Sequence, residues 1–433
     1  MSCKVLVKGV AVWQGDGFSG AVDLLIDEGR IARMGKGLSD PSAVEIRAED
    51  WLALPGLVDL HAHLGEPGHE ERESLDTGLA AAAWGGFTHV VAMPDTQPPV
   101  DTESAVQYLK ERASRIRGAR LLICAALTKE RSGMELAELA HLAAAGACAL
   151  GDAAPVEDPA LMRRALQYAS MLELPVFAQA ADARLSGGGV AHEGSAGHWL
   201  GLPGIPASAE WIAVARELLL AEETGGRVHL QGVSTGRSVQ LIREAKRRGV
   251  RVTAEVGFYH LLLDDEALAD YDTRKKLMPP LRPRADGEAL LEGVLDGTVD
   301  CIVTDHTPCT PEEKDAEFDV APFGAAGLEV ALPALYSRLV ATGKVSWAAL
   351  IEALSARPRR IAGLGEARIA EGAPCDLTLF APGESGSVDP SRWRSKARNT
   401  PLAGERLYGR VKGIAVGRRL CGPCFEELEE VAG

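Results

Sequence analysis

Residues 55–68, PGLVDLHAHLGEPG, constrain the fold more than any other stretch of the sequence. An apolar run typical of a strand, residues 52–60, ends in His61 and His63, and a loop rich in glycine and proline follows. Side chains two apart on a strand share a face, so both imidazoles leave the strand end together, as a chelating pair must. The stretch therefore predicts a metal at the C-terminal mouth of a parallel barrel. Two surface histidines paired by chance are the alternative.

From Gly56 onward, segments of strand pattern alternate with segments of helix pattern, which predicts a parallel sheet. The predicted barrel strands are residues 57–63, 88–93, 120–125, 147–152, 175–179, 227–231, 251–256 and 300–304. The predicted helices are residues 75–84, 105–116, 159–172, 209–222 and 235–248, then 328–342 and 347–354. Eight such strand and helix units make a (β/α)₈ barrel.

Both ends of the chain have a different pattern. Residues 4–54 contain short strands at 4–12, 21–26, 30–34 and 44–47, and the chain returns to strands at 373–380, 409–416 and 418–420. We expect one small β domain built from both ends. The predicted division is therefore residues 1–54 and 365–433 for the β domain, and residues 55–364 for the barrel.

Charge and composition exclude several partners. Of the 433 residues, 46% are hydrophobic, enough for a large core, and the formal charge of -15 repels nucleic acid and anionic membranes. The N-terminus lacks the apolar core of a signal peptide, and no run is long enough to span a membrane. The cysteines, such as Cys124, Cys148 and Cys301, are scattered singly through apolar runs, so we expect them to be reduced in a cytoplasmic protein.

Further motifs follow residues 55–68 in a fixed order: MPDTQPPVDT at 93–102, MPPLRPR at 278–284, TDHTP at 304–308 and APFG at 321–324. In this combination, over nearly the whole chain, the sequence resembles class I dihydroorotases of the amidohydrolase superfamily. The resemblance implies a (β/α)₈ TIM-type barrel of that superfamily with a small β-sandwich built from both chain ends.

The resemblance also implies a set of metal ligands. In the family these are the HxH pair, an aspartate after the fourth strand, a histidine on the fifth and the sixth strands, and an aspartate after the eighth that is also the general base. His61, His63, Asp152 and Asp305 match these positions. The two remaining histidine positions carry Gln179 and Gly232.

These substitutions limit the metal content that we expect. Glycine offers no ligand and a glutamine oxygen is a weak one, while His229 should point to the opposite face because it lies three residues before Gly232. A binuclear centre should be lost. His61, His63 and Asp305 could still form a three-ligand site with an open position, so we expect at most one zinc ion and no organic cofactor.

The positions that read the substrate in the family are also substituted. Gly65 replaces the arginine that pairs with the dihydroorotate carboxylate, and Asp95 replaces an asparagine and would set a negative charge beside an anionic substrate. Met278 replaces another asparagine and Cys309 a histidine. His260 and Arg282 remain as candidates to line the pocket.

Three functions stay open. The first is a non-catalytic dihydroorotase homologue of pyrimidine biosynthesis that acts as a structural partner of aspartate transcarbamoylase, and we expect this chain to form a homo-oligomer. The second is a mononuclear-zinc cyclic amidohydrolase with Asp305 as general base and a substrate other than dihydroorotate. The third, residual dihydroorotase activity, is opposed by Gly65 and Asp95.

Two other features are interpreted as structural. Cys421 and Cys424, in Cys-Gly-Pro-Cys, lack the fold context of a redox dithiol, so a turn with two thiols is favoured over a redox or zinc role. His192 and His198, in the glycine-rich loop at residues 186–201, are expected to face solvent.

Overall fold

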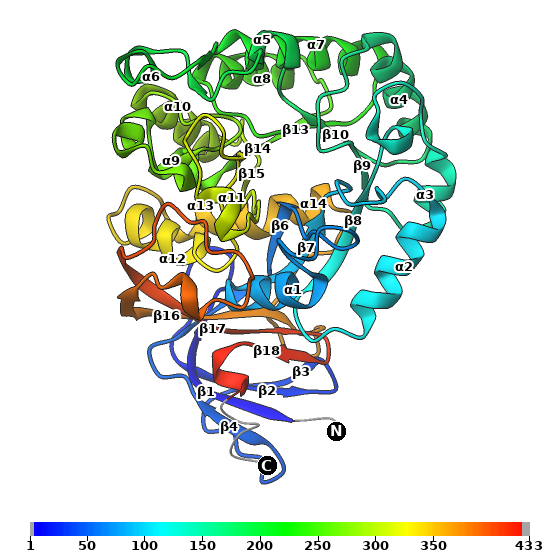
Figure 1. Cartoon of the computed structure of the whole chain (residues 1–433). Helices are drawn as coiled ribbons and strands as arrows, with labels where there is room; N and C mark the ends of the chain where they lie inside the picture. Colours follow the sequence, from blue (N-terminus) through cyan, green and yellow to red (C-terminus); the bar gives the residue numbers. More distant parts are fainter. Residues whose placement is uncertain (1–3, 427–433) are drawn as a thin grey trace.

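The computed structural model describes residues 4–426, so the outermost parts of the predicted end segments, residues 1–3 and 427–433, lie outside the described residues. Within 4–426, eight strands form one parallel sheet in sequence order, and the first strand meets the last through a bridge between Ala62 and His306. This is the expected (β/α)₈ barrel (Figure 1). Its strands are β6 (Leu57–Ala62), β7 (Phe87–Ala92), β8 (Arg120–Ala125), β9 (Ala149–Leu150), β10 (Val176–Gln179), β13 (Val228–Gln231), β14 (Val252–Gly257) and β15 (Cys301–Val303).

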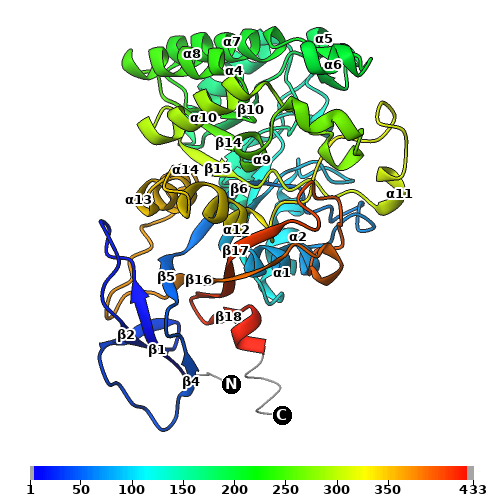
Figure 2. The same cartoon turned by 90° about the vertical axis from the view of Figure 1, so that its left-hand side faces the viewer.

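Helices follow the barrel strands and cover the outside of the sheet (Figure 2). Those that connect successive strands are α1 (Leu75–Trp84), α2 (Glu103–Ser114), α3 (Leu139–Ala145), α4 (Pro159–Met171), α7 (Ser208–Thr224), α8 (Gly236–Arg247) and α10 (Arg284–Asp296). Shorter pieces at the strand ends are α5 (Ala183–Ser186), β11 (Ala191–His192), α6 (Ser195–Trp199), β12 (Gly204–Ile205), α9 (Phe258–Leu262) and α11 (Pro311–Lys314). Short 3₁₀ helices are η1 (Lys129–Arg131), η2 (Asp265–Asp270), η3 (Thr273–Lys275) and η6 (Pro390–Arg392).

Three predicted elements are wrong in detail. The run at residues 52–60 is not one strand: β5 (Leu52–Pro55) joins the end sheet, and β6 begins the barrel after Gly56. The predicted helices at 328–342 and 347–354 each change to π-helical geometry part way, as α12 (Ala331–Leu335) with η4 (Tyr336–Val340), and α13 (Trp347–Ile351) with η5 (Glu352–Ala356). The helix α14 (Arg357–Ile361) then crosses under the barrel.

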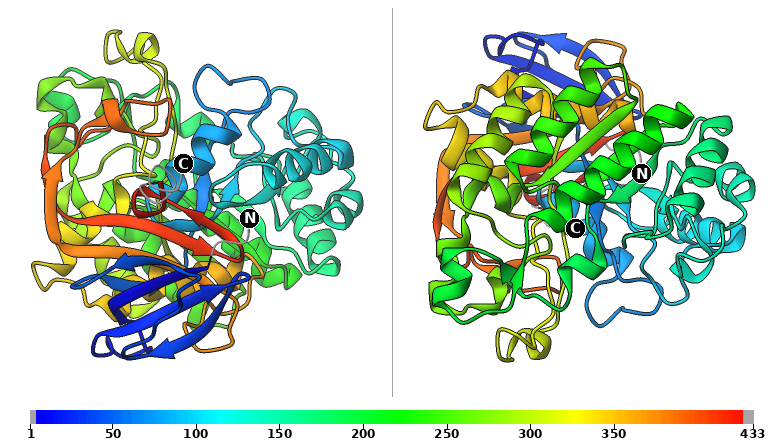
Figure 3. Two further views of the ribbon diagram at one scale, coloured as in Figure 1. Left: turned by 90° about the horizontal axis from the view of Figure 1, so that it is seen from below. Right: turned by 90° about the horizontal axis from the view of Figure 1, so that it is seen from above.

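The two chain ends build one sheet, as Figure 3 shows by the blue N-terminal strands beside the orange and red C-terminal ones. Its strands are β1 (Val5–Val12), β2 (Val22–Asp27), β3 (Arg30–Gly35), β4 (Val44–Arg47), β5, β16 (Asp376–Ser387), β17 (Arg406–Val416) and β18 (Arg419–Cys421). The strand β5 pairs with β1 on one side and with β16 on the other, so it joins the two halves.

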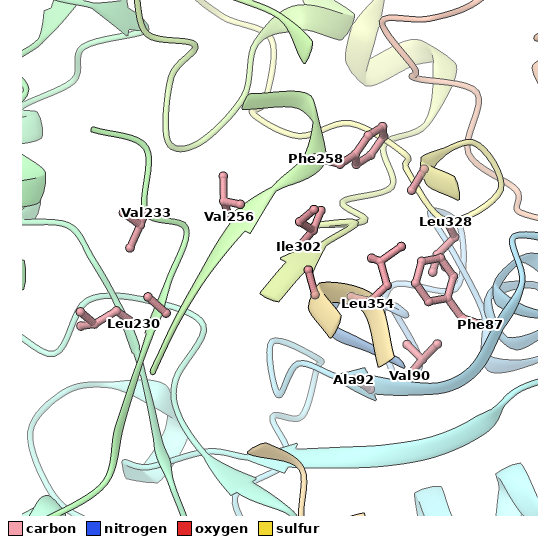
Figure 4. Close-up of a cluster of buried hydrophobic side chains, with 14 of the residues drawn as sticks. Phe87, Val90, Ala92, Leu230, Val233, Val256, Phe258, Ile302, Leu328 and Leu354 are labelled. Carbon is pink, nitrogen blue, oxygen red and sulfur yellow. The ribbon is translucent and has the colours of Figure 1, made fainter. Parts of the chain in front are cut away.

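Apolar side chains fill two regions around the barrel strands. Val58, Leu60, Val91 and Phe177 lie in a cluster inside the barrel. Neighbouring residues of opposite parity turn outward to the helices, among them Val90, Leu230, Val256 and Ile302 (Figure 4). The alternation follows from the two-residue period of a strand, and it leaves the strand ends to carry polar side chains.

No helix within residues 4–426 is long and apolar enough to cross a membrane. Cys124, Cys301 and Cys375 are buried and free, in line with the expectation of reduced cysteines.

Candidate metal and active site

Three predicted ligands converge at the C-terminal mouth of the barrel. One ligand atom each from His61, His63 and Asp305 lies within 4.8 Å of the others, and the two imidazole rings have centroids 5.3 Å apart. Asp305 has a positive φ of 48°, in the left-handed region that non-glycine residues seldom adopt. Strained backbone of this kind collects at functional sites, and here it places a carboxylate beside two imidazoles.

Each histidine of the pair is oriented by a carboxylate. Nδ1 of His61 lies 2.5 Å from Oε1 of Glu255, and Nδ1 of His63 lies 2.6 Å from Oδ2 of Asp95. With the proton on Nδ1, each ring keeps its Nε2 lone pair for another partner, and Nε2 of His61 lies 3.8 Å from Asp305. Carboxylates that fix the histidine tautomer in this way are the usual outer shell of a metal site.

Glu255 is a site residue that sequence reasoning missed. It lies on β14, fully buried, and its second oxygen is 2.9 Å from Nε2 of His229, whose Nδ1 is 2.9 Å from the Thr253 hydroxyl. The expectation that His229 points away from the site is therefore wrong, because His229 lies inside the barrel beside Phe177 and is linked to His61 through Glu255. A glutamate in the inward register of a strand was the available signal.

The charges of this group are strongly coupled. Burial opposes ionisation of Glu255, but His61 and His229 together outweigh it and lower the pKa of Glu255 to about 2. Burial likewise opposes the charged form of His61, and Glu255, Asp305 and Asp59 together raise the pKa of His61 to about 9. Burial raises the pKa of Asp305. A cation, either a proton or a metal, is therefore favoured between these carboxylates.

The donor set fits one zinc ion. Two imidazoles and one carboxylate supply the nitrogen and oxygen ligands that zinc prefers, and a catalytic zinc site uses three protein ligands. Within the described part of the chain, these three residues are the group of histidine, cysteine and acidic side chains close enough to hold an ion.

Asp152, the fourth predicted ligand, lies apart from this group. Its Oδ1 accepts hydrogen bonds from the backbone N–H groups of Leu127 (2.8 Å) and Thr128 (2.9 Å), and its Oδ2 accepts one from the Thr128 hydroxyl (2.5 Å). Burial raises the pKa of Asp152. The carboxylate thus holds the loop after β8 in place.

The positions of the two missing histidines lie on neighbouring strands. Gln179 and Gln231 pair in register at the ends of β10 and β13, and Gln231 is buried with an Oε1 that has no hydrogen-bond partner. Gly232 follows with a φ of +64°, and a Cβ there would lie 3.1 Å from Cδ of Pro279. A side chain at 232 would therefore be strained and crowded.

The structure also places the residues at the positions of the family's substrate contacts, Gly65, Cys309 and Met278. Gly65 has a φ of +68°, and a Cβ on it would lie 2.5 Å from the carbonyl oxygen of Glu73 and 2.7 Å from that of His69. The sulfur of Cys309 faces the backbone carbonyl oxygens of Thr307 and Phe323, and the residue is buried. Met278 is half-buried, in the segment before α10.

The two remaining candidates differ. His260 donates from Nε2 to the Pro279 carbonyl oxygen at 2.9 Å, and its buried Nδ1 has no hydrogen-bond partner. Arg282 is buried and donates to the Ser234 hydroxyl (3.0 Å) and to Nδ1 of His192 (2.9 Å). It therefore holds the glycine-rich loop at residues 186–201 in place. The expectation that His192 faces solvent is wrong for that reason, whereas His198 is exposed.

Comparisons with known proteins agree with this architecture. A family model described as dihydro-orotase-like matches residues 51–238. A dihydroorotase of Pelotomaculum thermopropionicum is 47% identical over 422 residues, 96% of this chain and 98% of the relative. One of Caldanaerobacter subterraneus subsp. tengcongensis is 42% identical over 410 residues, 94% of this chain and 95% of the relative. Among solved structures, L-hydantoinase (dihydropyrimidinase) from Arthrobacter aurescens superposes with a TM-score of 0.84 at 25% identity, over 98% of this chain and 96% of that one.

Proposed function

The chain belongs to the dihydroorotase family of the amidohydrolase superfamily, and from that premise we propose that it is a non-catalytic homologue serving pyrimidine biosynthesis as a structural partner of aspartate transcarbamoylase. One observation carries the proposal. Of the ligand positions that the resemblance implies, Gly232 and Gln179 carry no imidazole, and the oxygens of Asp152 are engaged by Leu127 and Thr128. The second metal of the family has no ligand set here.

The substrate positions support the same proposal. Gly65 lies against the backbone of Glu73 and His69, so the guanidinium that would bind a substrate carboxylate is absent and its place is filled. Asp95 is bound to His63, and the imidazole holds the pKa of Asp95 well below its usual range, so the carboxylate is charged. Each lost charge-assisted contact costs ~1.5–3 kcal/mol, and the Asp95 charge adds repulsion.

The catalytic part is tested by assay. Purified protein should show no interconversion of carbamoyl aspartate and dihydroorotate above the rate of an Asp305→Asn variant prepared in the same way. Contaminating enzyme contributes equally to both preparations, so the difference belongs to this chain. A difference corresponding to ~1 s⁻¹ or more, an ordinary enzyme rate, would contradict the proposal.

The partner is tested by assembly. Exposed apolar side chains lie on two neighbouring helices, among them Met171 of α4 and Leu219 of α7, and each offers a contact for a partner or for a second copy. We expect co-elution with the aspartate transcarbamoylase of the same genome in size-exclusion chromatography, and loss of co-elution with Met171→Asp and Leu219→Asp. A chain that elutes apart from the transcarbamoylase at micromolar concentrations would refute the partnership.

A second candidate is favoured by the convergence of His61, His63 and Asp305 with both Nδ1 atoms held. These three residues would hold one zinc ion, which when bound supplies a Lewis acid and an acidified water. Asp305 would then move the proton as general base, and Asp95 would disfavour an anionic substrate. This reading predicts hydrolysis of a neutral cyclic amide.

Metal analysis separates the two candidates. After incubation with zinc and gel filtration, the single-metal reading expects about one equivalent, lost in His61→Ala, and hydrolysis of hydantoin or dihydrouracil. Absence of bound zinc and of hydrolysis leaves the structural role. Two equivalents would contradict both candidates.

A further inference from the structure

Two adjoining cavities open at the N-terminal ends of the barrel strands, the end opposite the metal-ligand group. Their volumes are about 520 and 250 Å³, and Pro175, Arg227, Arg251 and Ile361 line both. The larger volume falls within the range of ~300–1,000 Å³ that small-molecule sites occupy. Because this is the far end of the barrel, its use does not depend on whether the mouth is catalytic.

The shared wall carries two arginines side by side. Val228 of β13 and Val252 of β14 are in register, so Arg227 and Arg251, one residue earlier on each strand, are neighbours. Burial, and then the charge of Arg251, lower the pKa of Arg227. Within residues 4–426, no carboxylate oxygen lies within 4 Å of either guanidinium, although Arg251 donates to the Gly225 carbonyl at 3.2 Å. In the described part of the chain, the half-buried Arg227 and the exposed Arg251 thus lie side by side without an ion-pair partner.

Other charges around the smaller cavity do not neutralise the pair. Arg357 and Arg360 share a single carboxylate, Glu352, at 3.6 Å each. Asp300 is engaged by Lys246 (2.6 Å) and by the N–H of Ala254 (2.8 Å). Glu173, on the wall of the larger cavity, acts on Arg227 only from beyond ion-pair distance. The lining is therefore basic in a chain whose formal charge is -15.

We propose that this pocket binds a phosphorylated small molecule, with its phosphate between Arg227 and Arg251 and its remainder against the apolar wall. A guanidinium fork matches phosphate oxygens in pairs, and two adjacent forks suit one dianion. Leu174, Pro175, Ile361 and Ala362 give the larger cavity an apolar side that a sugar or ring can cover. The like-charge repulsion between the arginines is relieved when the phosphate is bound.

The test is calorimetric titration of the full chain in phosphate-free buffer. Ribose 5-phosphate is the probe, ribose the unphosphorylated control and inorganic phosphate the minimal ligand. We expect ribose 5-phosphate to bind, ribose not to bind, and inorganic phosphate to compete. Arg227→Met and Arg251→Met should each weaken binding about tenfold or more, because each removes charge-assisted hydrogen bonds. Arg247→Met, which removes an exposed arginine of α8 outside both cavities, should leave binding within about twofold.

Phosphorus NMR with the unaltered protein tests the pocket without any variant, so it still applies if a variant does not fold. Broadening of the ribose 5-phosphate signal by the chain, reversed by excess inorganic phosphate, supports the pocket. Absence of broadening and of heat, equal affinity for ribose, or equal weakening by Arg247→Met would overturn it.

Discussion

At the residue scale, Gly65 replaces the arginine of the family at a position that has no room for a side chain. Its positive φ of +68° and the backbone oxygens of Glu73 and His69 leave no room for a Cβ. The loop after β6 is therefore built around the absence of a side chain. Putting back an arginine by mutation would disturb the loop before it could reach a ligand.

Gly65→Ala should lower the free energy of unfolding by ~2–5 kcal/mol, since strain at positive φ and overlap with backbone act together. Gly133→Ala is the matched control, because Gly133 has a φ of +69° with nothing within 4 Å of a Cβ. It should cost only ~1 kcal/mol. Urea unfolding of both variants measures the difference, and equal costs would show that the loop yields easily.

The contact between Asp95 and His63 indicates what Asp95 does in this chain. Where the family resemblance implies an asparagine that contacts substrate, this carboxylate binds Nδ1 of His63 at 2.6 Å. It therefore orients His63 of the candidate metal site, and its charge would oppose an anionic substrate.

Under the single-zinc candidate, Asp95→Asn should weaken zinc binding about tenfold or more, because the outer carboxylate raises the basicity of the imidazole. Competition against a chromogenic chelator measures the affinity. Asp16→Asn, which removes an exposed carboxylate before β2, is the control and should leave the affinity unchanged. An unchanged affinity in Asp95→Asn would mean that His63 needs no carboxylate partner.

At the scale of elements, the loop between β8 and η1 depends on Asp152. Three hydrogen bonds from Leu127 and Thr128 end on its two oxygens. Asp152, which follows the fourth barrel strand β9, therefore joins the loop after β9 to the loop after β8.

Asp152→Ala should lower the free energy of unfolding by ~2–4 kcal/mol, because buried N–H groups lose their acceptor, and should leave zinc content unchanged. Asp158→Ala removes the exposed cap that accepts from Ala160 N–H at 2.8 Å, and should cost ~1 kcal/mol. Denaturation and metal analysis are made on the same samples. Loss of zinc with unchanged stability would identify Asp152 as a ligand instead.

At the scale of the whole molecule, the end sheet and the barrel are joined through Arg359. From α14 its Nη2 lies 2.5 Å from Oδ2 of Asp376 on β16, and Nη1 donates to the Gly56 carbonyl at 3.2 Å. Ser355 donates to the same carbonyl at 2.7 Å. Gly56, which separates β5 from β6, is therefore hydrogen-bonded to both η5 and α14.

Arg359→Met should destabilise the chain by ~3 kcal/mol, because it removes the ion-pair partner of the half-buried carboxylate of Asp376 and, among the described residues, leaves that carboxylate only His89, at 3.9 Å. Arg163→Met is the control, since it breaks an exposed ion pair with Glu223 and should cost under ~1 kcal/mol. Circular dichroism and tryptophan fluorescence should report one shared transition in urea. Two separate transitions in the unaltered chain would show that the junction does not couple the sheet to the barrel.

The sequence by itself predicted the eight barrel strands and the strands of both chain ends, because the two-residue and 3.6-residue periods are local properties of the chain. Of the helices that connect successive barrel strands, it missed α3 and α10. It also determined that His61 and His63 leave one strand end together. The extent of the run at residues 52–60 was not determined, because both halves are apolar and only their sheet partners, β16 for β5 and β7 for β6, separate them.

Only the tertiary structure decided the chemistry around those histidines. Glu255 reaches His61 across 194 residues of sequence and Asp95 reaches His63 across 32, and both contacts depend on closure of the barrel. Closure of the barrel also brings Asp152 into contact with Thr128, Arg282 into contact with His192, and Arg227 next to Arg251. A side chain's partner is set by the packing of distant strands, which no local pattern records.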